Sequence, residues 1–401
     1  MGDDQPDYDV IVVGLGAMGS SAAYHLARRG LRVLGIEQFT PAHAFGSSHG
    51  STRIVRQAYF ERPDYVPLLQ RSYELWDELS ASFGEQLFVR CGALMIGPPE
   101  GAVVKGTLES ARRWGLAHEL LDATAMKQRF PQFNLPPDHV AVFEANAGFA
   151  RAEPSVLANI ELAIDAGAEL WFDTEVESVQ LGPAGVYIEA ADVEVHAPKA
   201  VIATGAWASR LAKLDQFRVE VQRQTVHWYE PLPGAGADDS SQETVDYTAF
   251  EPERFPVYLW EWPTADGEPS TEIYGFPHQP AEHGVKVALY RDGVVTDPDR
   301  LDRAVTDQDA LRLAPVLAKS IPQLKGRRLT GLACMYAGVA DDDFVLGMHP
   351  GSAGKVVLAV GFSGHGFKFL PVVGEIVADL VTAGQTRHEI EFLSPERISR
   401  S

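Results

Sequence analysis

Cysteine is nearly absent from this chain of 401 residues, which contains only Cys91 and Cys334. Two cysteines cannot build the disulfide framework of a small secreted protein, and no cysteines and histidines cluster at the spacing of a metal site. We therefore expect a cytoplasmic protein in a reducing compartment, without a bound metal.

Long apolar runs are also missing. No run reaches the roughly 18 residues that a membrane-spanning helix needs. The N-terminal segment MGDDQPDYD is acidic where a signal peptide is basic. We therefore expect neither a membrane partner nor secretion.

Positive charge is scarce as well, because 34 lysines and arginines stand against 55 aspartates and glutamates, a formal net charge of −21. A molecule with this excess of negative charge repels the phosphates of nucleic acids and of anionic membranes. We therefore expect no nucleic-acid partner, although local groups of basic residues can still bind a small anion.

The first forty residues contain a glycine pattern with a definite mechanism. The apolar run Val10–Val13 predicts a buried strand that leads into GxGxxG and then into a helical pattern. Gly14 permits the tight turn, Gly16 lets backbone N–H groups approach a pyrophosphate, and Gly19 lets the helix pack on the strand.

A second strand and an acid complete this β-α-β unit. The segment Leu31–Ile36 predicts a strand that ends at Glu37. An acid roughly 20 residues after the glycines accepts hydrogen bonds from an adenosine ribose. Strand, glycines, helix, second strand and acid occur in the required order, so we predict a dinucleotide site.

Two later turns are expected beside the same ligand. The strand Ala200–Ala203 stops at the turn Thr204–Trp207, and the strand Lys355–Val360 leads into GFSGHG before an apolar helix. Turns at the carboxyl ends of parallel strands meet at the ligand-binding edge of the sheet.

Between these segments the chain changes character. From Val219 it is rich in β-branched and aromatic residues, which predicts strands of a substrate-covering domain. The pattern also predicts one strand over Leu87–Ile96 that contains Cys91, a helix with Asp64 as its N-cap, and a solvent loop over Pro231–Asp246.

Four motifs follow the glycine pattern in the order GSSHGSTRIVR, HGVKV, CMY and GFSGHGFKF. With them the chain resembles the monomeric sarcosine oxidase and N-methyltryptophan oxidase family, from Asp9 to about Leu380. The resemblance implies an α/β (α+β two-domain) fold, with a Rossmann-like FAD-binding domain and an inserted, mostly antiparallel β-sheet substrate domain. We expect the FAD-binding domain at 1–90, 145–218 and 326–401 and the substrate domain at 91–144 and 219–325.

The resemblance also implies a reaction. An N-methyl or other secondary amino acid is oxidised to an imine, water hydrolyses the imine to an aldehyde and an amine, and O₂ becomes hydrogen peroxide. The small-molecule substrate and O₂ are then the partners of a monomer. Two alternatives stay open: an amino-acid dehydrogenase that passes electrons to a quinone or protein acceptor, and a flavin-binding protein without turnover.

Several motif residues take roles from the resemblance. It implies that Cys334 carries FAD covalently, that Lys286 promotes the reaction of reduced flavin with O₂, and that Arg53 and Lys368 bind the substrate carboxylate. For Arg56, a surface ion pair and a functional role are equally open.

The substrate cavity is where the chain departs from the family. Tyr274, His49 and Tyr290 are expected to line it, although aromatic packing is a nearly equal alternative for Tyr290. The sarcosine and N-methyltryptophan enzymes place a histidine at the position of Tyr290 and often a polar run at Ala337–Val339, which argues against sarcosine itself as the substrate. The residues expected to contact FAD are Gly14, Gly16, Gly19, Glu37, Gln38, Ser47, Ser48, Thr52, Val176, Gly205, Trp207, Cys334, Gly364, Gly366 and Lys368.

Overall fold

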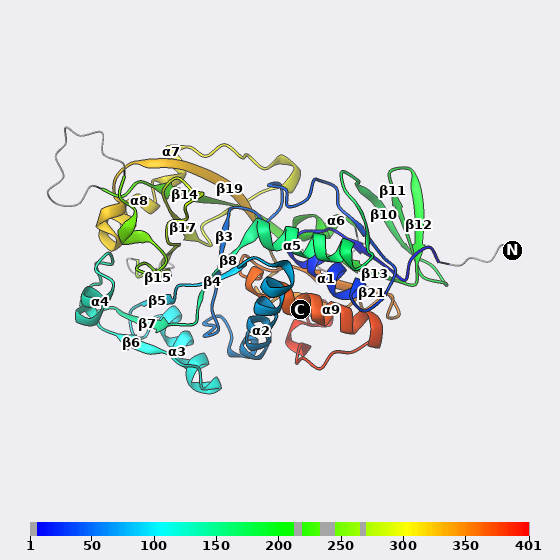
Figure 1. Cartoon of the computed structure of the whole chain (residues 1–401), viewed down its shortest axis with the longest axis horizontal. Coiled ribbons are helices and arrows are strands. Elements are labelled where there is room, and N and C mark those ends of the chain that lie inside the picture. The colour runs from blue at the N-terminus through cyan, green and yellow to red at the C-terminus, as the bar shows by residue number, and fades with distance from the viewer. Residues whose placement is uncertain (1–5, 212–218, 233–244, 265–269, 401) are drawn as a thin grey trace.

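The computed structural model describes residues 6–211, 219–232, 245–264 and 270–400. Two large sheets lie towards opposite ends of its long axis, and the long strand β19 (Arg328–Gly338) runs from one towards the other (Figure 1).

The first large sheet combines strands from the beginning, the middle and the end of the chain. The outer strand β20 is antiparallel to β21, and the other neighbours are parallel. In order across the sheet, the strands are β20 (Val345–Met348), β21 (Val356–Val360), β13 (Lys199–Ile202), β1 (Val10–Val13), β2 (Val33–Ile36) and β9 (Glu169–Trp171).

The alternation of side chains along β1 explains how both faces of this sheet are covered. Val10 and Val12 pack with the helices on one face, and Ile11 and Val13 pack with a small antiparallel sheet on the other. The result is a three-layer arrangement of helices, parallel sheet and antiparallel sheet. The helices are α1 (Ala17–Ala27), α2 (Val66–Phe83), α5 (Ala152–Asp165) and α9 (Leu370–Ala383), and the small sheet contains β10 (Val176–Leu181), β11 (Val186–Ala190) and β12 (Val193–Ala197).

The second large sheet is antiparallel except where β15 lies parallel to β5. Helices α4 (Ala123–Arg129) and α8 (Leu313–Ser320) cover one face, and α3 (Ala102–Trp114) packs against part of the other. β19 also belongs to this sheet and pairs with β14, outside the linear order of the other strands. The strands are β18 (Val294–Val295), β14 (Glu220–Tyr229), β17 (Val285–Tyr290), β16 (Thr271–Gly275), β15 (Val257–Trp262), β5 (Ala93–Gly97), β7 (Val140–Glu144) and β6 (Glu119–Leu121).

These two sheets confirm the predicted fold class, a Rossmann-like sheet joined to a mostly antiparallel one. A further three-stranded sheet contains β3 (Thr52–Val55), β8 (Gly148–Arg151) and β4 (Phe88–Arg90). The proposed domain boundaries remain a prediction. β19, assigned to the FAD-binding domain, pairs with β14 of the substrate sheet.

The prediction of one strand over Leu87–Ile96 is wrong. The segment forms β4 and β5, which belong to different sheets, with Cys91 between them. Gly92 breaks the strand with φ +79, and a Cβ there would lie 2.5 Å from the Phe143 ring. A continuous strand cannot adopt this left-handed backbone, so the chain changes sheets.

The prediction that Asp64 caps a helix is also wrong. Asp64 lies within a short 3₁₀ turn, Pro63–Tyr65, and Tyr65 is the N-cap of α2. The Asp64 carboxylate instead pairs with Arg62 and Arg113, each at 2.9 Å. Most of the predicted solvent loop, at 233–244, lies outside the described residues.

Candidate active site

One cavity is lined by residues of both large sheets and of the loops between them. Every residue that the sequence predicts to contact cofactor or substrate lines it, except Gly19. Gly19 has the packing role expected of it, because a Cβ there would lie 1.7 Å from the Gly14 carbonyl oxygen. The helix α1 can therefore approach the first turn only with glycine at this position.

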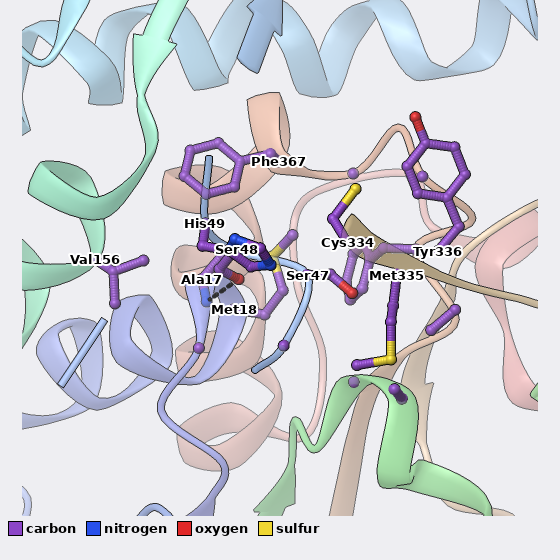
Figure 2. A pocket seen from close by; sticks show the side chains of 18 of the residues that line it. Ala17, Met18, Ser47, Ser48, His49, Val156, Cys334, Met335, Tyr336 and Phe367 are labelled. Carbon is purple, nitrogen blue, oxygen red and sulfur yellow. Dashed lines mark hydrogen bonds between the residues drawn. The ribbon is translucent and has the colours of Figure 1, made fainter. Parts of the chain in front are cut away.

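The N-terminus of α1 opens into this cavity. Gly14 has φ +86, and the Ala17 N–H donates to Ser48 Oγ at 3.1 Å, as the dashed line in Figure 2 marks. Free N–H groups at a helix N-terminus suit a phosphate. The segment that carries Ser48 thus meets the glycine turn, as predicted from the order of the motifs.

Glu37 ends β2 and is buried beside the glycine turn. Its Oε2 accepts from the Leu15 N–H at 2.8 Å and its Oε1 from the Phe39 N–H at 3.2 Å. Each carboxylate oxygen has a second lone pair. The residue can therefore accept further hydrogen bonds from ligand hydroxyls while it holds the turn.

Strand register places the catalytic candidates on one face of the second sheet. Tyr274 pairs with Ala288 and Gln224 with Cys334, while Lys286 and Tyr290 lie two residues either side of Ala288. Side chains alternate along a strand, so these residues share a face. Figure 2 shows the same alternation on β19, where Cys334 and Tyr336 point away from Met335.

A first group of cations, the buried Lys286 and the partly buried Arg53, holds the loop 47–52. Lys286 Nζ donates to the carbonyl oxygen of Gly50, and to the carbonyl and the hydroxyl oxygens of Thr52, both at 3.1 Å. Arg53 donates to the carbonyl oxygens of Thr52 at 2.8 Å, Ser47 at 2.9 Å, and His49. Burial, and then the charge of Arg53, lowers the pKa of Lys286 to about 7.

A second group contains Arg56, Glu61 and Lys368. Arg56 is 3% exposed and donates two hydrogen bonds to the Glu61 carboxylate, at 2.8 and 2.6 Å. Burial favours the neutral acid, but Arg56 outweighs it and holds the pKa of Glu61 at about 2. Burial, and then the charge of Arg56, lowers the pKa of Lys368 to about 7, while its Nζ donates to the His365 carbonyl oxygen at 2.7 Å.

The predicted pairing of Arg53 with Lys368 at the substrate carboxylate remains a prediction. After burial, the charge of Arg56 has the largest effect on the pKa of Lys368, and three backbone carbonyl oxygens accept hydrogen bonds from the Arg53 guanidinium. The surface ion pair considered for Arg56 is wrong because the pair is buried. Sequence reasoning missed Glu61, whose one signal was an acid inside the otherwise apolar run AYFE.

Cys334 and His49 are buried in the cavity wall. Burial raises the pKa of the Cys334 thiol, although Arg53 and Lys286 act in the opposite direction. His49 Nε2 is buried without a hydrogen-bond partner among the described residues, and burial lowers the pKa of its ring to about 3. A buried polar atom without a partner is costly and often faces a ligand.

Aromatic side chains close the substrate end of the cavity. The Tyr274 ring meets the Tyr290 ring edge-on at 6.3 Å, and Tyr290 meets Tyr336 at the same separation. Tyr336 and His365, which sequence reasoning gave no role, both line the cavity.

Comparison with known proteins agrees with this geometry. The family model described as FAD dependent oxidoreductase matches residues 9–380. The chain belongs to this family.

Its relatives include a monomeric sarcosine oxidase of Streptomyces avermitilis, 44% identical with 98% of each chain covered. An N-methyl-L-tryptophan oxidase of Salmonella heidelberg is 35% identical, with 98% of this chain and 99% of the relative covered. The solved structure of NikD, an unusual amino acid oxidase, aligns with a TM-score of 0.79 at 25% identity, covering 98% of each chain. These findings confirm the resemblance and FAD as the cofactor.

The residues present fit FAD. The glycine turn and the α1 N-terminus suit its pyrophosphate, Glu37 has acceptor capacity for a ribose, and the orphaned His49 Nε2 lies in the same cavity. Within the described ranges, no helix combines the length and apolar character of a membrane span.

The buried Arg56–Glu61 pair gives a stability prediction. Arg56→Gln leaves the Glu61 carboxylate buried and unpaired, which should cost about 3–5 kcal/mol of unfolding free energy at pH 8. In the wild type the pKa of Glu61 lies below its unfolded value, so the pair stabilises the fold above the unfolded pKa and loses this effect as pH falls towards 2. In the variant the buried acid takes up a proton instead, so the deficit should shrink as pH falls towards about 4.

Urea unfolding at several pH values measures this deficit. Arg62→Gln is the control, because Arg62 pairs with Asp64 and Asp343 near the surface and should lose at most about 1 kcal/mol. Equal deficits for the two variants at every pH would contradict the role of the buried pair.

Proposed function

We propose that this protein is an FAD-dependent oxidase of N-methyl or other secondary amino acids. The observation that carries the proposal is one cavity that joins a dinucleotide-binding turn to two separate groups of cations, one containing the buried Lys286 and the other the buried Arg56 and Lys368. An amino-acid oxidase needs one cation for the substrate carboxylate and one near O₂. The identities of 44% and 35% to enzymes named for N-methyl substrates support the same reaction.

The reaction balances without a metal or a further cofactor. When bound, FAD would accept the two electrons that the substrate loses as its C–H and N–H bonds break and its C–N bond becomes C=N, and would later deliver them to O₂. The secondary amine loses two electrons and two protons to become an imine, water converts the imine to an aldehyde and an amine, and O₂ becomes hydrogen peroxide. The protein contributes orientation and charge.

For orientation, we assign the substrate carboxylate to Arg56 and Lys368. Both are buried and line the cavity, the charge of Arg56 acts on the pKa of Lys368, and Lys368 is not ion-paired to any described residue. Glu61 balances the charge of Arg56, so Lys368 supplies the unbalanced positive charge. Arg53 is assigned to holding the loop 47–52, with Lys286, at the flavin.

Other parts of the proposal have less direct support. We propose a monomer, as the name of the Streptomyces avermitilis relative suggests for that protein. We also propose a cytoplasmic location, because Cys91 and Cys334 form no disulfide with each other. The division into an FAD-binding and a substrate domain at the expected boundaries belongs to the same proposal.

The function is tested by mixing the protein with a panel of N-methyl and cyclic amino acids without O₂ and then admitting air. We expect the flavin absorbance to bleach and hydrogen peroxide to form on re-oxidation. Bleaching without peroxide would favour the dehydrogenase, and no bleaching with any substrate would favour a flavin-binding protein without turnover.

Covalent attachment of FAD is proposed through Cys334. The thiol is buried in the cavity wall, where burial raises its pKa and the charges of Arg53 and Lys286 offset part of this effect. Acid-precipitated wild-type protein should remain yellow, whereas Cys334→Ala should release its flavin into the supernatant. Release from the wild type would contradict attachment, and Cys91→Ala is the matched control.

Lys286 is proposed to speed the reaction of reduced flavin with O₂. A preorganised buried cation stabilises the negative charge that develops on oxygen. Lys286→Met should slow re-oxidation by a factor of about 10² or more and leave anaerobic reduction much less affected. Stopped-flow absorbance separates the two rates, and the exposed Lys105→Met serves as control. An unchanged re-oxidation rate would remove this role.

The carboxylate assignment is tested with an N-methyl amino acid and the matching amine that lacks the carboxylate. Lys368→Ala and Arg56→Lys should weaken binding of the amino acid by a factor of about 10 or more, and should change binding of the amine little. Arg53→Lys should affect both compounds alike, because it acts through the loop. If Arg53→Lys were the one variant that selectively weakened binding of the amino acid, the pairing of Arg53 with Lys368 would be restored.

A further inference from the structure

The ring of Tyr59 contacts both cations of the second group. Tyr59 is fully buried and does not itself line the cavity, whereas Arg56 and Lys368 do. The guanidinium carbon of Arg56 lies 4.5 Å from the centroid of the Tyr59 ring, and Lys368 Nζ lies 5.1 Å from it. The face of an aromatic ring attracts a cation without neutralising its charge. Burial and the charge of Arg56 both disfavour the charged form of Lys368, so the ring supports a cation that its surroundings oppose.

The hydroxyl of Tyr59 meets Nδ1 of His365, and the surroundings of the imidazole decide which group donates. His365 Nε2 donates to the Asp342 carbonyl oxygen at 3.1 Å, because a carbonyl oxygen can only accept. Burial lowers the pKa of the His365 ring to about 3, so the ring is neutral and Nδ1 keeps its lone pair. The Tyr59 hydroxyl therefore donates to Nδ1. With both nitrogens bonded, the imidazole is held in one orientation.

The backbone of His365 continues the connection to Lys368. The His365 carbonyl oxygen accepts from Lys368 Nζ at 2.7 Å. The Lys368 backbone is also held, because its carbonyl oxygen accepts from Ser72 Oγ at 2.6 Å and from Trp76 Nε1 at 3.0 Å. Both ends of the lysine side chain are thus fixed, and the end that carries the charge depends on His365.

Core packing alone does not explain these contacts. The Tyr59 ring also packs against Tyr65 and Phe369, with centroids 5.0 and 5.5 Å away, and this packing accounts for its burial. A phenylalanine would pack equally well, and it would need no partner for a hydroxyl. The hydroxyl joins the loop after β3 to the turn after β21, which lies 306 residues further along the chain.

We propose that Tyr59 is a positioning residue of the carboxylate site. Its ring holds Arg56 and Lys368 beside each other, and its hydroxyl holds Lys368 through His365. Two cations can orient one carboxylate only when their separation is fixed. This inference rests on the proposed function, and within it on the assignment of the carboxylate to Arg56 and Lys368.

The test compares an N-methyl amino acid with the matching amine that lacks the carboxylate. The rate of anaerobic flavin reduction per unit substrate concentration is measured for both, and their ratio reports what the carboxylate contributes. Tyr59→Phe keeps the ring and should lower this ratio by a factor of about 3–10. Tyr59→Leu also removes the ring and should lower it by a factor of about 10 or more. A loss of packing alone would slow both compounds alike and leave the ratio unchanged.

A double variant tests the route through Lys368. Because the hydroxyl acts through this lysine, adding Tyr59→Phe to Lys368→Ala should lower the ratio no further. Tyr65→Phe is the matched control, since Tyr65 is equally buried. Its hydroxyl donates to Asp343 Oδ1 at 3.0 Å and accepts from the Phe344 N–H at 3.1 Å, so the ratio should stay unchanged.

The possible failures are distinguishable. If Lys368→Ala lowers the ratio and Tyr59→Phe does not, only this inference is overturned. It is also overturned if Tyr59→Phe lowers the ratio by the same factor with and without Lys368. If the wild type does not prefer the amino acid to the amine, the carboxylate assignment fails together with this inference. If no compound reduces the flavin, the proposed function fails as well.

Discussion

The long antiparallel pairing of β14 with β19 is the interaction on which the rest of the site depends. It extends from the pair Glu220 and Gly338 to the pair Tyr229 and Arg328, and so ties β19 to the substrate sheet along its whole length. The opposite face of β19 places Met335 and Ala337 in the core beside the parallel sheet. One strand therefore fixes the position of Cys334 relative to both sheets.

The second constraint is the burial of positive charge in a protein that is strongly acidic overall. Lys286, Arg53, Arg56 and Lys368 are all held by acceptors, most of which are backbone carbonyl oxygens. Carbonyl dipoles stabilise a cation without cancelling its charge, whereas a carboxylate would neutralise it. Of the four, only Arg56 is paired with an acid, so the cavity keeps a positive field despite the negative charge of the whole molecule.

Much of the fold followed from local patterns. The β-α-β unit, the turn Thr204–Trp207 and the second glycine turn were predictable because each consists of sequence neighbours that form one structural unit. The strand over Leu87–Ile96 was not, because its break at Gly92 is imposed by the Phe143 ring, which is distant in sequence. Asp64 had the right residue type for a cap, but two arginines compete for its carboxylate.

The candidate site shows the same difference between features set by sequence neighbours and features set by residues distant in sequence. The motifs predicted residues that line the cavity, because they lie on the turns and strands of both large sheets that surround it. They did not predict which cations act together. Arg53 and Arg56 are three residues apart, yet one faces loop carbonyls and the other faces Glu61. Which buried charges pair with each other depends on strand register and loop geometry, and neither can be predicted from a short segment of sequence.

The strand order of the first sheet has a consequence for how the protein is made. β1 and α1 come from the first thirty residues, but β21 and α9, which complete the same sheet and cover the same helix, come from residues 356–383. A chain emerging from the ribosome therefore presents the glycine turn long before the elements that enclose it exist. Contacts of such long sequence separation form slowly. The compartment for FAD is therefore closed only when β21 and α9 have packed with β1 and α1, from which they are distant in sequence.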